Sequence, residues 1–279
     1  MNCFMFPGQP LSHADNPTED DDVREITALV MDRAGLDLPS FAWKGNEYSE
    51  HVGLQVYGVA MSLIENRRLR RLGAQPSIIA EHSMGIYPAM ASCGALPEGE
   101  AVEITLRIGA CLAAMGDRGD YALGCITGLP VSPLMAIAAN NAIYIANYNT
   151  SRHFLLSGER RNVEEAVAEA LAQGAFSAKT FPCDAPLHTP LLEEKGAGLA
   201  EIVRDYRFKE PSMPLMSHID QDFLTAVDLP DFLVRELCLP VQWEQTFRAL
   251  CSAGVTRFVE VGAGDSLKKY NRWIASESQ

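Results

Sequence analysis

Short apolar strand patterns alternate with helical patterns along most of this chain, and this alternation leaves few folds open to it. A strand is predicted at Cys3 to Phe6, where Pro7-Gly8 ends it, and further strands at Ser77 to Ala80 and Arg257 to Val261. A long helical pattern runs from His51 to Leu72 with valines and leucines on one face. The alternation predicts an α/β fold, with a mainly parallel sheet that helices cover on both faces.

The pattern changes character between residues 121 and 181, where six shorter elements follow in the order strand, helix, strand, strand, helix, strand. Strands are predicted at Tyr121 to Thr127, Ala142 to Asn147, His153 to Leu156 and Phe176 to Phe181, and helices at Ser132 to Asn140 and Val163 to Gln173. We interpret this block as a small domain, residues 120–183, inserted into a discontinuous larger domain, residues 1–119 and 184–279. Gly116-Asp117-Arg118-Gly119 and Pro182 flank the insertion.

Charge and composition exclude several classes of function. The net charge of −13 and the isoelectric point near 4.9 argue against nucleic-acid binding, which needs a basic face. No apolar stretch is long enough to span a bilayer, and residues 1–6 lack the basic segment of a secretion signal. Seven scattered cysteines, none in a Cys-x-x-Cys pair, are typical of reduced, mostly buried thiols in a cytoplasmic protein. The histidines and cysteines do not cluster along the sequence, so no metal or redox cofactor is predicted.

A candidate nucleophile lies where a strand pattern gives way to a helical one. The segment is His82-Ser83-Met84-Gly85-Ile86, which follows Glu81 and the apolar run Ser77-Ile78-Ile79-Ala80. A sharp turn between strand and helix exposes a serine hydroxyl and brings helix N-terminal amides close to a developing oxyanion. The alternative is that Ser83 only caps the helix that follows.

Five further segments accompany this turn in a fixed order. All six are Phe6-Pro7-Gly8-Gln9, His82-Ser83-Met84-Gly85, Asn147-Tyr148-Asn149, Leu187-His188, Val234-Arg235-Glu236 with Pro240-Val241-Gln242-Trp243, and Glu260-Val261-Gly262-Ala263-Gly264. Together they resemble the malonyl-CoA:acyl carrier protein transacylase family, which includes the acyltransferase domains of fatty acid and polyketide synthases. The resemblance covers nearly the whole chain. It implies an α/β-hydrolase-like large domain with an inserted ferredoxin-like small domain.

The resemblance also implies the catalytic roles. Ser83 corresponds to the nucleophile, and His188 to the general base, which a main-chain carbonyl at Glu236 orients in place of an aspartate. Since that role belongs to the backbone, the Glu236 side chain is expected to be replaceable. Gln9 and the amide of Met84 correspond to the oxyanion hole. On the residues alone, His188 could equally be an ordinary loop histidine, and Gln9 a surface turn residue.

Three residues correspond to the substrate pocket of the family. Arg107 matches the arginine that forms a bidentate pair with the free carboxylate of malonyl, provided that a one-residue gap is placed between Leu96 and Glu100. The alternative for Arg107 is a structural salt bridge. Asn149 and Leu187 match positions of the acyl pocket, where a branched apolar residue favours a small acyl group.

The implied reaction moves malonyl, or a similar small acyl group, from CoA to the phosphopantetheine thiol of an acyl carrier protein. CoA thioester and carrier are substrates, and no bound cofactor is expected. Glu81 departs from the family because that position in the turn is normally a small residue. This departure leaves a non-catalytic subunit that binds the carrier as one alternative. The other is a thioesterase-like hydrolase, which would use the same dyad with water as the acceptor.

Because carrier proteins are usually acidic, an acidic partner enzyme needs a local basic patch. Two arginine clusters are candidates, Arg67 to Arg71 at the end of the long helix and Arg160-Arg161 in the small domain. The alternative for the first cluster is favourable interaction with the helix C-terminus.

Overall fold

A computed structural model describes residues 1–13, 18–116 and 120–277, and its larger part is built on a four-stranded parallel sheet. The strands are β1 (Asn2–Phe6), β4 (Ile78–Glu81), β9 (Leu215–Met216) and β10 (Arg257–Glu260), in the order β10-β1-β4-β9. Each neighbouring pair is parallel. The mixed α/β fold with a parallel sheet, predicted from the alternation, is confirmed.

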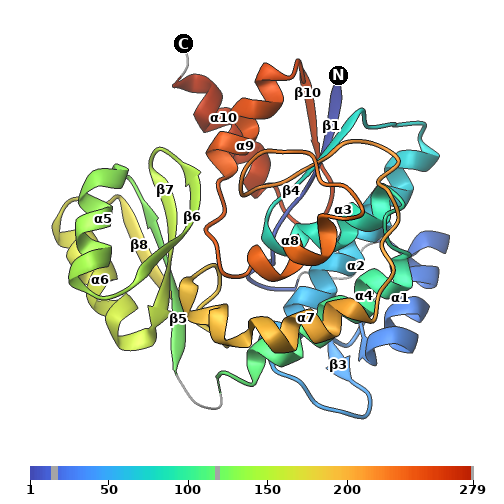
Figure 1. The fold of residues 1–279 in the computed structure, drawn as a ribbon, viewed down its shortest axis with the longest axis horizontal. Coiled ribbons are helices and arrows are strands. Elements are labelled where there is room, and N and C mark those ends of the chain that lie inside the picture. Colours follow the sequence, from blue (N-terminus) through green and yellow to red (C-terminus); the bar gives the residue numbers. More distant parts are fainter. Residues whose placement is uncertain (14–17, 117–119, 278–279) are drawn as a thin grey trace.

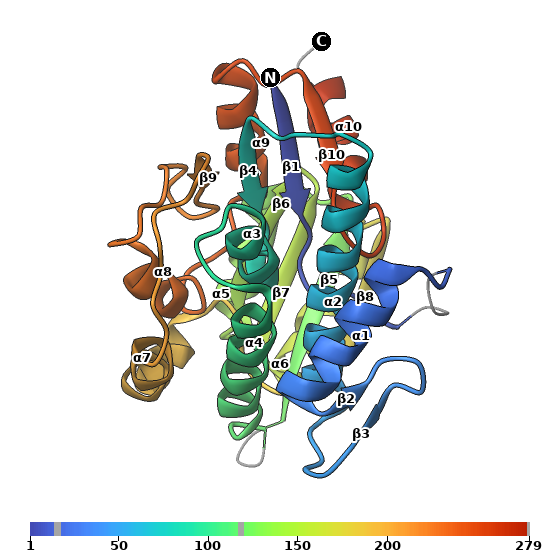
Figure 2. The same ribbon diagram turned by 90° about the vertical axis from the view of Figure 1, so that its right-hand side faces the viewer.

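Alternate residues of β1 point into two different cores, as strand geometry requires. Phe4 and Phe6 pack in one core, and Cys3 and Met5 pack in the other. The first core is closed mainly by α1 (Asp21–Ala34), α2 (Glu50–Arg71), α3 (Ile86–Ser92), α4 (Glu98–Ala113), α7 (Gly196–Arg204) and α8 (Leu229–Arg235). The second is closed by α9 (Trp243–Ser252) and α10 (Ser266–Ser276), and Figure 2 shows the two groups of helices around the sheet.

Helix ends follow the chemistry of the local sequence. Asp20 caps α1 by accepting a hydrogen bond from the backbone N–H of Val23 at 3.0 Å, and Gly35 ends that helix with φ of 72°. Ser49 caps α2 in the same way, through the N–H of Val52. The acidic segment around Asp20 therefore opens a helix, and Ser49 fixes where α2 starts.

The second sheet is antiparallel and occupies the left side of Figure 1. It consists of β5 (Tyr121–Thr127), β6 (Tyr144–Thr150), β7 (His153–Glu159) and β8 (Ser177–Cys183) in the order β6-β7-β5-β8, with α5 (Val131–Asn140) and α6 (Arg160–Ala172). The two helices and the strands share one apolar core. The order of these six elements is the predicted one. Of the flanking segment at 116–119, residues 117–119 lie outside the described residues.

Short elements complete the chain. They are the hairpin of β2 (Leu36–Asp37) and β3 (Ala42–Trp43) and the 3-10 turns η1 (Ser83–Gly85) and η2 (Pro190–Lys195). None of the helices in the described ranges is long and apolar enough to cross a membrane. The thiols are less buried than predicted: Cys3, Cys93 and Cys183 are buried, Cys251 is exposed and the other three are intermediate.

Candidate active site

The turn that carries Ser83 is held by close backbone packing at the carboxyl end of β4. The N–H of His82 donates to the carbonyl of Phe6 at 3.0 Å, and Ser83 adopts a left-handed φ of 56°. A Cβ at Gly85 would lie 2.2 Å from the same Phe6 oxygen, so only glycine fits there. A left-handed backbone conformation at serine is unfavourable in free energy, and the contacts of the surrounding backbone hold Ser83 in it.

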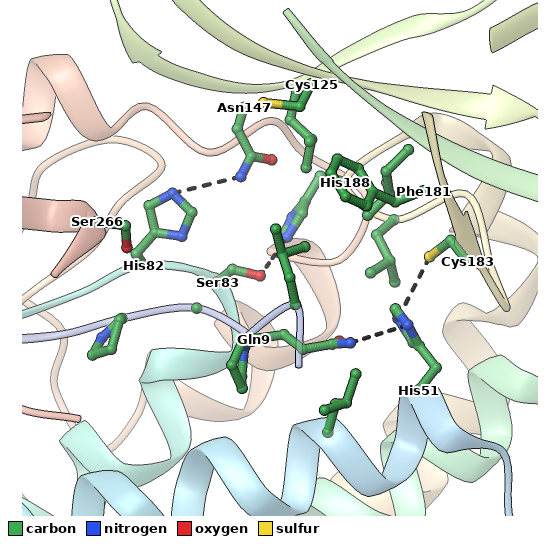
Figure 3. Close-up of a pocket in the computed structure, with 18 of the residues that line it drawn as sticks. Gln9, His51, His82, Ser83, Cys125, Asn147, Phe181, Cys183, His188 and Ser266 are labelled. Atoms are coloured by element: carbon green, nitrogen blue, oxygen red, sulfur yellow. Dashed lines mark hydrogen bonds between the residues drawn. The ribbon is translucent and has the colours of Figure 1, made fainter. Parts of the chain in front are cut away.

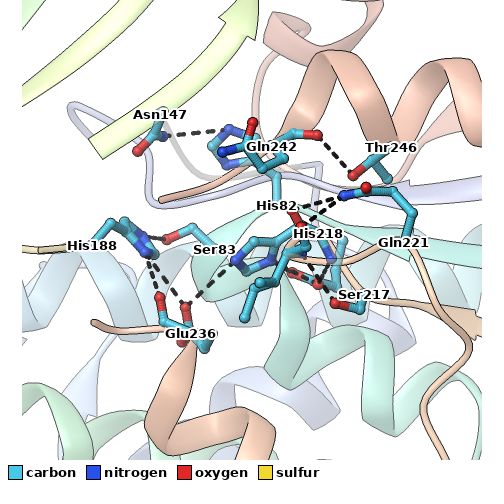
Figure 4. A network of polar contacts seen from close by, with 12 residues as sticks. His82, Ser83, Asn147, His188, Ser217, His218, Gln221, Glu236, Gln242 and Thr246 are labelled. Atoms are coloured by element: carbon cyan, nitrogen blue, oxygen red, sulfur yellow. Dashed lines mark hydrogen bonds and ion pairs between the residues drawn. The ribbon is translucent and has the colours of Figure 1, made fainter. Parts of the chain in front are cut away.

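Ser83 and His188 form a hydrogen-bonded pair (Figure 4), with 2.6 Å between Oγ and Nε2. On the other side of the ring, His188 Nδ1 lies 2.8 Å from the carbonyl oxygen of Glu236. A carbonyl only accepts hydrogen bonds, so Nδ1 carries the proton and donates it. Nε2 is then free to accept from the Ser83 hydroxyl, which is the arrangement that a serine nucleophile and its general base require.

Burial keeps His188 neutral. The ring is only 3% exposed, and this desolvation, with a smaller contribution from His218, lowers the pKa of His188 to about 3. The imidazole is therefore present as a base at neutral pH. Its tautomer is fixed by a main-chain oxygen that cannot titrate.

The Glu236 side chain also belongs to the site. Its side chain is 1% exposed, and Oε2 lies 3.7 Å from His188 Nδ1, with no hydrogen-bond partner among the described residues. Burial raises the pKa of Glu236 well above its usual value, and the neighbouring Glu81 adds to this. His188 donates its hydrogen bond to the Glu236 carbonyl and not to this carboxyl group, so the replaceability of the side chain stays a prediction.

Glu81, the unusual residue of the turn, is paired inside the protein. Its two carboxyl oxygens lie 2.8 and 2.7 Å from Nδ1 of His218, whose backbone N–H also donates to Glu81 at 3.2 Å. Both side chains are 0% exposed. Burial raises the pKa of Glu81 and lowers that of His218 to about 3. The larger residue is thus accommodated by a histidine that supplies its hydrogen bonds.

The histidines do not cluster along the sequence, but the fold brings two of them close together in space. Ligand atoms of His188, His218 and Glu236 lie within 4.8 Å of one another. These groups could in principle hold a metal ion. However, Nε2 of His188 is bonded to Ser83 and Nδ1 to the Glu236 carbonyl, so a metal there would displace the general base. We therefore assign His188 to its hydrogen bonds with Ser83 and the Glu236 carbonyl and not to a metal site.

The dyad opens into a cavity of about 1480 Å³ between the two sheets (Figure 3). Gln9 and Leu187 line this cavity and also a smaller inner one next to Ser83. Nε2 of Gln9 donates to Nδ1 of His51 at 3.0 Å, and Nε2 of that ring faces Cys183 Sγ at 3.5 Å. His51 therefore fixes the side chain that is expected to contribute to the oxyanion hole.

Asn149 also lines the large cavity, where its side chain holds the residue before the nucleophile. Its Oδ1 accepts from Nε2 of His82 at 2.9 Å, and Nδ2 of Asn147 lies 3.5 Å from the same nitrogen. Met84 lines the inner cavity within the turn η1. Both residues lie at the site, and Asn149 contributes there to the position of the turn.

The structure does not bring Arg107 to the site. Its guanidinium pairs with Asp205 at 2.6 Å and contacts the hydroxyl of Tyr206 at 3.3 Å, both at the end of α7. The side chain is 36% exposed and lines neither cavity. The match to Arg107 needed a one-residue gap, and without the gap the matched residue is Ile108, which lines the inner cavity. Arg107 therefore forms a structural salt bridge, which was the alternative to carboxylate binding.

The arginines of the two clusters form ion pairs and hydrogen bonds within the chain. Arg67 pairs with Glu25 and Glu98, and the other pairs are Arg68 with Asp20, Arg71 with Asp22, Arg160 with Asp120 and Arg161 with Glu165. Arg70 donates to the carbonyl of Ser92 at 2.9 Å. Ion pairs within the chain therefore engage all of these arginines except Arg70, and docking of a carrier on either cluster stays a prediction.

Sequence reasoning missed two supporting residues, His51 and His218. Their partners, Gln9 and Glu81, are 42 and 137 residues away in the chain. One signal was present for the second pair: a carboxylate at the end of a buried strand requires a buried partner, and His218 follows strand β9 beside it. No comparable signal pointed to His51.

The chain is similar to known acyltransferases over nearly its whole length. The model of the acyl transferase domain family matches residues 24–269. The malonyl CoA-acyl carrier protein transacylases of Bacillus subtilis strain 168 and Escherichia coli K12 are 28% and 27% identical, over 97% and 95% of this chain and 90% of each relative. The structure of the transacylase from Coxiella burnetii superposes with a TM-score of 0.89 at 25% identity, covering 99% of this chain and 91% of that one.

A second solved structure is a malonyl-transacylase in complex with a type II polyketide synthase acyl-carrier protein, with a TM-score of 0.88, 25% identity and coverage of 99% and 93%. The mixed α/β fold and these relatives place the chain in a class of enzymes. The chain belongs to the acyl transferase domain family.

Proposed function

We propose that this protein transfers a small acyl group, malonyl or a similar one, from CoA to the phosphopantetheine thiol of an acyl carrier protein. The observation that carries the proposal is the 2.6 Å contact between Ser83 Oγ and Nε2 of a neutral, tautomer-fixed His188, open to a cavity of about 1480 Å³. The relatives named above, including the one bound to its carrier, support the choice of donor and acceptor. The reaction uses CoA thioester and carrier as substrates and requires no resident cofactor.

The first half-reaction acylates the enzyme. Ser83 Oγ bonds to the thioester carbonyl carbon while its proton passes to Nε2 of His188. The carbon–sulfur bond then breaks, and the leaving sulfur takes that proton, so free CoA departs and an ester remains on Ser83. In the second half, the phosphopantetheine thiol gives its proton to His188 and attacks the ester carbonyl. Ser83 leaves with the proton, and the acyl group stays on the carrier.

Two donors are proposed for the oxyanion formed in both halves. The Gln9 side-chain amide stands at the carboxyl end of β1, and the Met84 amide follows the nucleophile in the turn. His51 holds Gln9 before substrate arrives, and such preorganised donors stabilise charge without reorganisation during the reaction. Removing one oxyanion donor typically costs about 100-fold or more in rate.

The domain description is part of the proposal. We assign residues 1–119 and 184–279 to an α/β-hydrolase-like catalytic domain and residues 120–183 to a ferredoxin-like small domain. The strand order β6-β7-β5-β8, with two helices in a common core, supports the second assignment. Asn149 on β6 and Ser83 after β4 line one cavity, so both domains contribute to the site.

A thioesterase-like hydrolase uses the same dyad with water as the acceptor. Binding of a carboxylate by Arg107 would have argued against it, but the position of that side chain beside Asp205 removes this argument. The two activities differ in the fate of the acyl-enzyme. A non-catalytic subunit, in contrast, would form no acyl-enzyme at all.

The test is to form the acyl-enzyme, remove free thioester by rapid desalting, and follow its discharge in buffer with and without a holo carrier protein. A transferase gives discharge that accelerates with carrier concentration and yields acylated carrier. Discharge at the same rate with and without carrier identifies the hydrolase. The control is the apo carrier, which lacks the phosphopantetheine thiol and should leave the rate unchanged.

A further inference from the structure

The inner cavity next to Ser83 is where an acyl group on that residue would extend. Its volume is about 40 Å³, and its wall includes Ser83 and His188 together with apolar side chains at Ile108, Leu112 and Leu187. Among the described residues that line it there is no lysine or arginine. A space of this size and lining fits a small apolar group.

The orientation of α4 explains why the cavity lacks a cation. Thr105, Ile108 and Leu112 recur three and four positions apart, so they share the helix face that lines the cavity. Arg107 precedes Ile108 by one residue, which turns its side chain about 100° around the helix. There it pairs with Asp205 on the outside of the protein.

The polar groups around the cavity are neutral or acidic. The hydroxyl of Tyr87 and Oε2 of Glu236 are buried without a hydrogen-bond partner among the described residues. Gln55 contributes an amide, and Thr105 Oγ1 already donates to the carbonyl of Ala101 at 2.7 Å. A substrate carboxylate placed here would meet a buried acid and no cation. Such an uncompensated buried charge is costly.

Basic side chains do line the larger cavity, but they are engaged elsewhere. Arg160 pairs with Asp120, and Lys269 pairs with Asp265 at 2.7 Å. Arg152 is exposed and donates to the carbonyl of Gly128 at 3.0 Å. None of these three lines the inner cavity, so they suit the phosphates of CoA or phosphopantetheine better than the acyl end.

We propose that the acyl group this enzyme accepts on Ser83 is a small uncharged one, such as acetyl or propionyl, in preference to the dicarboxylic malonyl. Ile108 is the residue that sets this preference, because it occupies the α4 position facing the cavity. The inference rests on the proposed acyl transfer and narrows its substrate class. The proposed donor and acceptor thiols are unaffected by it.

The test measures the rate at which Ser83 is acylated by acetyl-CoA, propionyl-CoA, malonyl-CoA and methylmalonyl-CoA, by intact-protein mass spectrometry after rapid quenching. We expect the uncharged thioesters to react on the order of 100-fold faster than malonyl-CoA. Acylation by malonyl-CoA at an equal or higher rate overturns the inference and leaves the transferase standing. Absence of an adduct from all four overturns the proposed function, and the inference with it.

Variants on α4 locate the preference. Ile108→Arg should raise malonyl acylation relative to acetyl by at least about 10-fold, because it places a cation on the cavity face. Ile108→Met changes the shape of this side chain without adding a charge, and it should keep the wild-type order of acylation rates. Arg107→Ala removes the salt bridge to Asp205 and the contact with Tyr206, neither of which lines the cavity, and should also keep the wild-type order of rates. The assignment of Ile108 is contradicted if Arg107→Ala changes the ratio of malonyl to acetyl acylation in favour of acetyl while Ile108→Arg leaves that ratio unchanged. If Ile108→Arg does not fold, the acylation rates of the wild-type enzyme still decide the inference.

Discussion

Glu81, two residues before Ser83, forms a fully buried pair with His218, with 2.7 Å between Oε2 and Nδ1. A carboxyl group is expensive to bury unless its hydrogen bonds are satisfied, and His218 satisfies them with both its ring and its backbone N–H. The pair explains how the turn at Ser83 keeps its geometry with a large residue in a position that is normally small. It also fixes β4 against the segment that follows β9.

Breaking this pair from one side should strongly destabilise the protein. Glu81→Ala leaves Nδ1 and the backbone N–H of His218 without their partner in the interior, and each unsatisfied buried polar group costs about 1–3 kcal/mol. Urea denaturation of Glu81→Ala, His218→Ala and the double variant measures the free energies of unfolding. We expect the double variant to lose clearly less than the sum of the two singles. Additive losses would mean that the contact is not energetically coupled.

The Glu236 side chain and its carbonyl have separable roles. His188 donates Nδ1–H to the carbonyl at 2.8 Å, whereas the carboxyl oxygen lies 3.7 Å away. Glu236→Gln keeps the volume and the backbone, so acylation of Ser83 should stay within about 5-fold of wild type. Stopped-flow release of CoA thiol measures the rate. A fall on the order of 10⁴-fold, as in a triad that loses its acid, would show that the carboxylate orients His188.

Much of this site follows from local sequence. The Ser83 turn and the six elements of the small domain are each encoded in a few neighbouring residues or in segments of recognisable order. The His188–Glu236 carbonyl contact joins residues 48 positions apart, and only the resemblance to the family predicts it. The Glu81–His218 pair cannot be predicted from local sequence, because it joins two buried residues that are 137 positions apart. Arg107 shows the limit most clearly. On a helix, one residue of register separates the cavity face from the solvent face, and only the packed structure fixes that register.

The pH dependence of acylation should reflect the lowered pKa of His188. The base acts when neutral, and burial moves its protonation from the usual value of 6.5 to about 3. Acylation activity should therefore persist as the solution is acidified, and it should be lost only well below the usual pKa of histidine. Single-turnover acylation rates between about pH 5 and 8 should be nearly constant. Circular dichroism at each pH confirms that the enzyme stays folded. A decline centred near pH 6.5 would contradict the account.

The left-handed backbone at Ser83 should cost stability. With φ of 56°, a residue with a Cβ is strained there, and glycine is not. Ser83→Gly should therefore be more stable than Ser83→Ala by about 1 kcal/mol, while both lack the nucleophile. Thermal unfolding of the two variants side by side provides the comparison. Equal stabilities would show that the turn relaxes when the hydroxyl is removed.

The most direct test of the account is whether Ser83 carries the acyl group. Intact-protein mass spectrometry follows wild type, Ser83→Ala and His188→Ala after brief mixing with acetyl-CoA, and peptide mapping locates the adduct. We predict one added acetyl group on wild type, located on Ser83, none on Ser83→Ala, and a strongly reduced amount on His188→Ala. An adduct of equal size on Ser83→Ala, or no adduct on wild type with any acyl-CoA, would contradict the dyad as the catalytic centre.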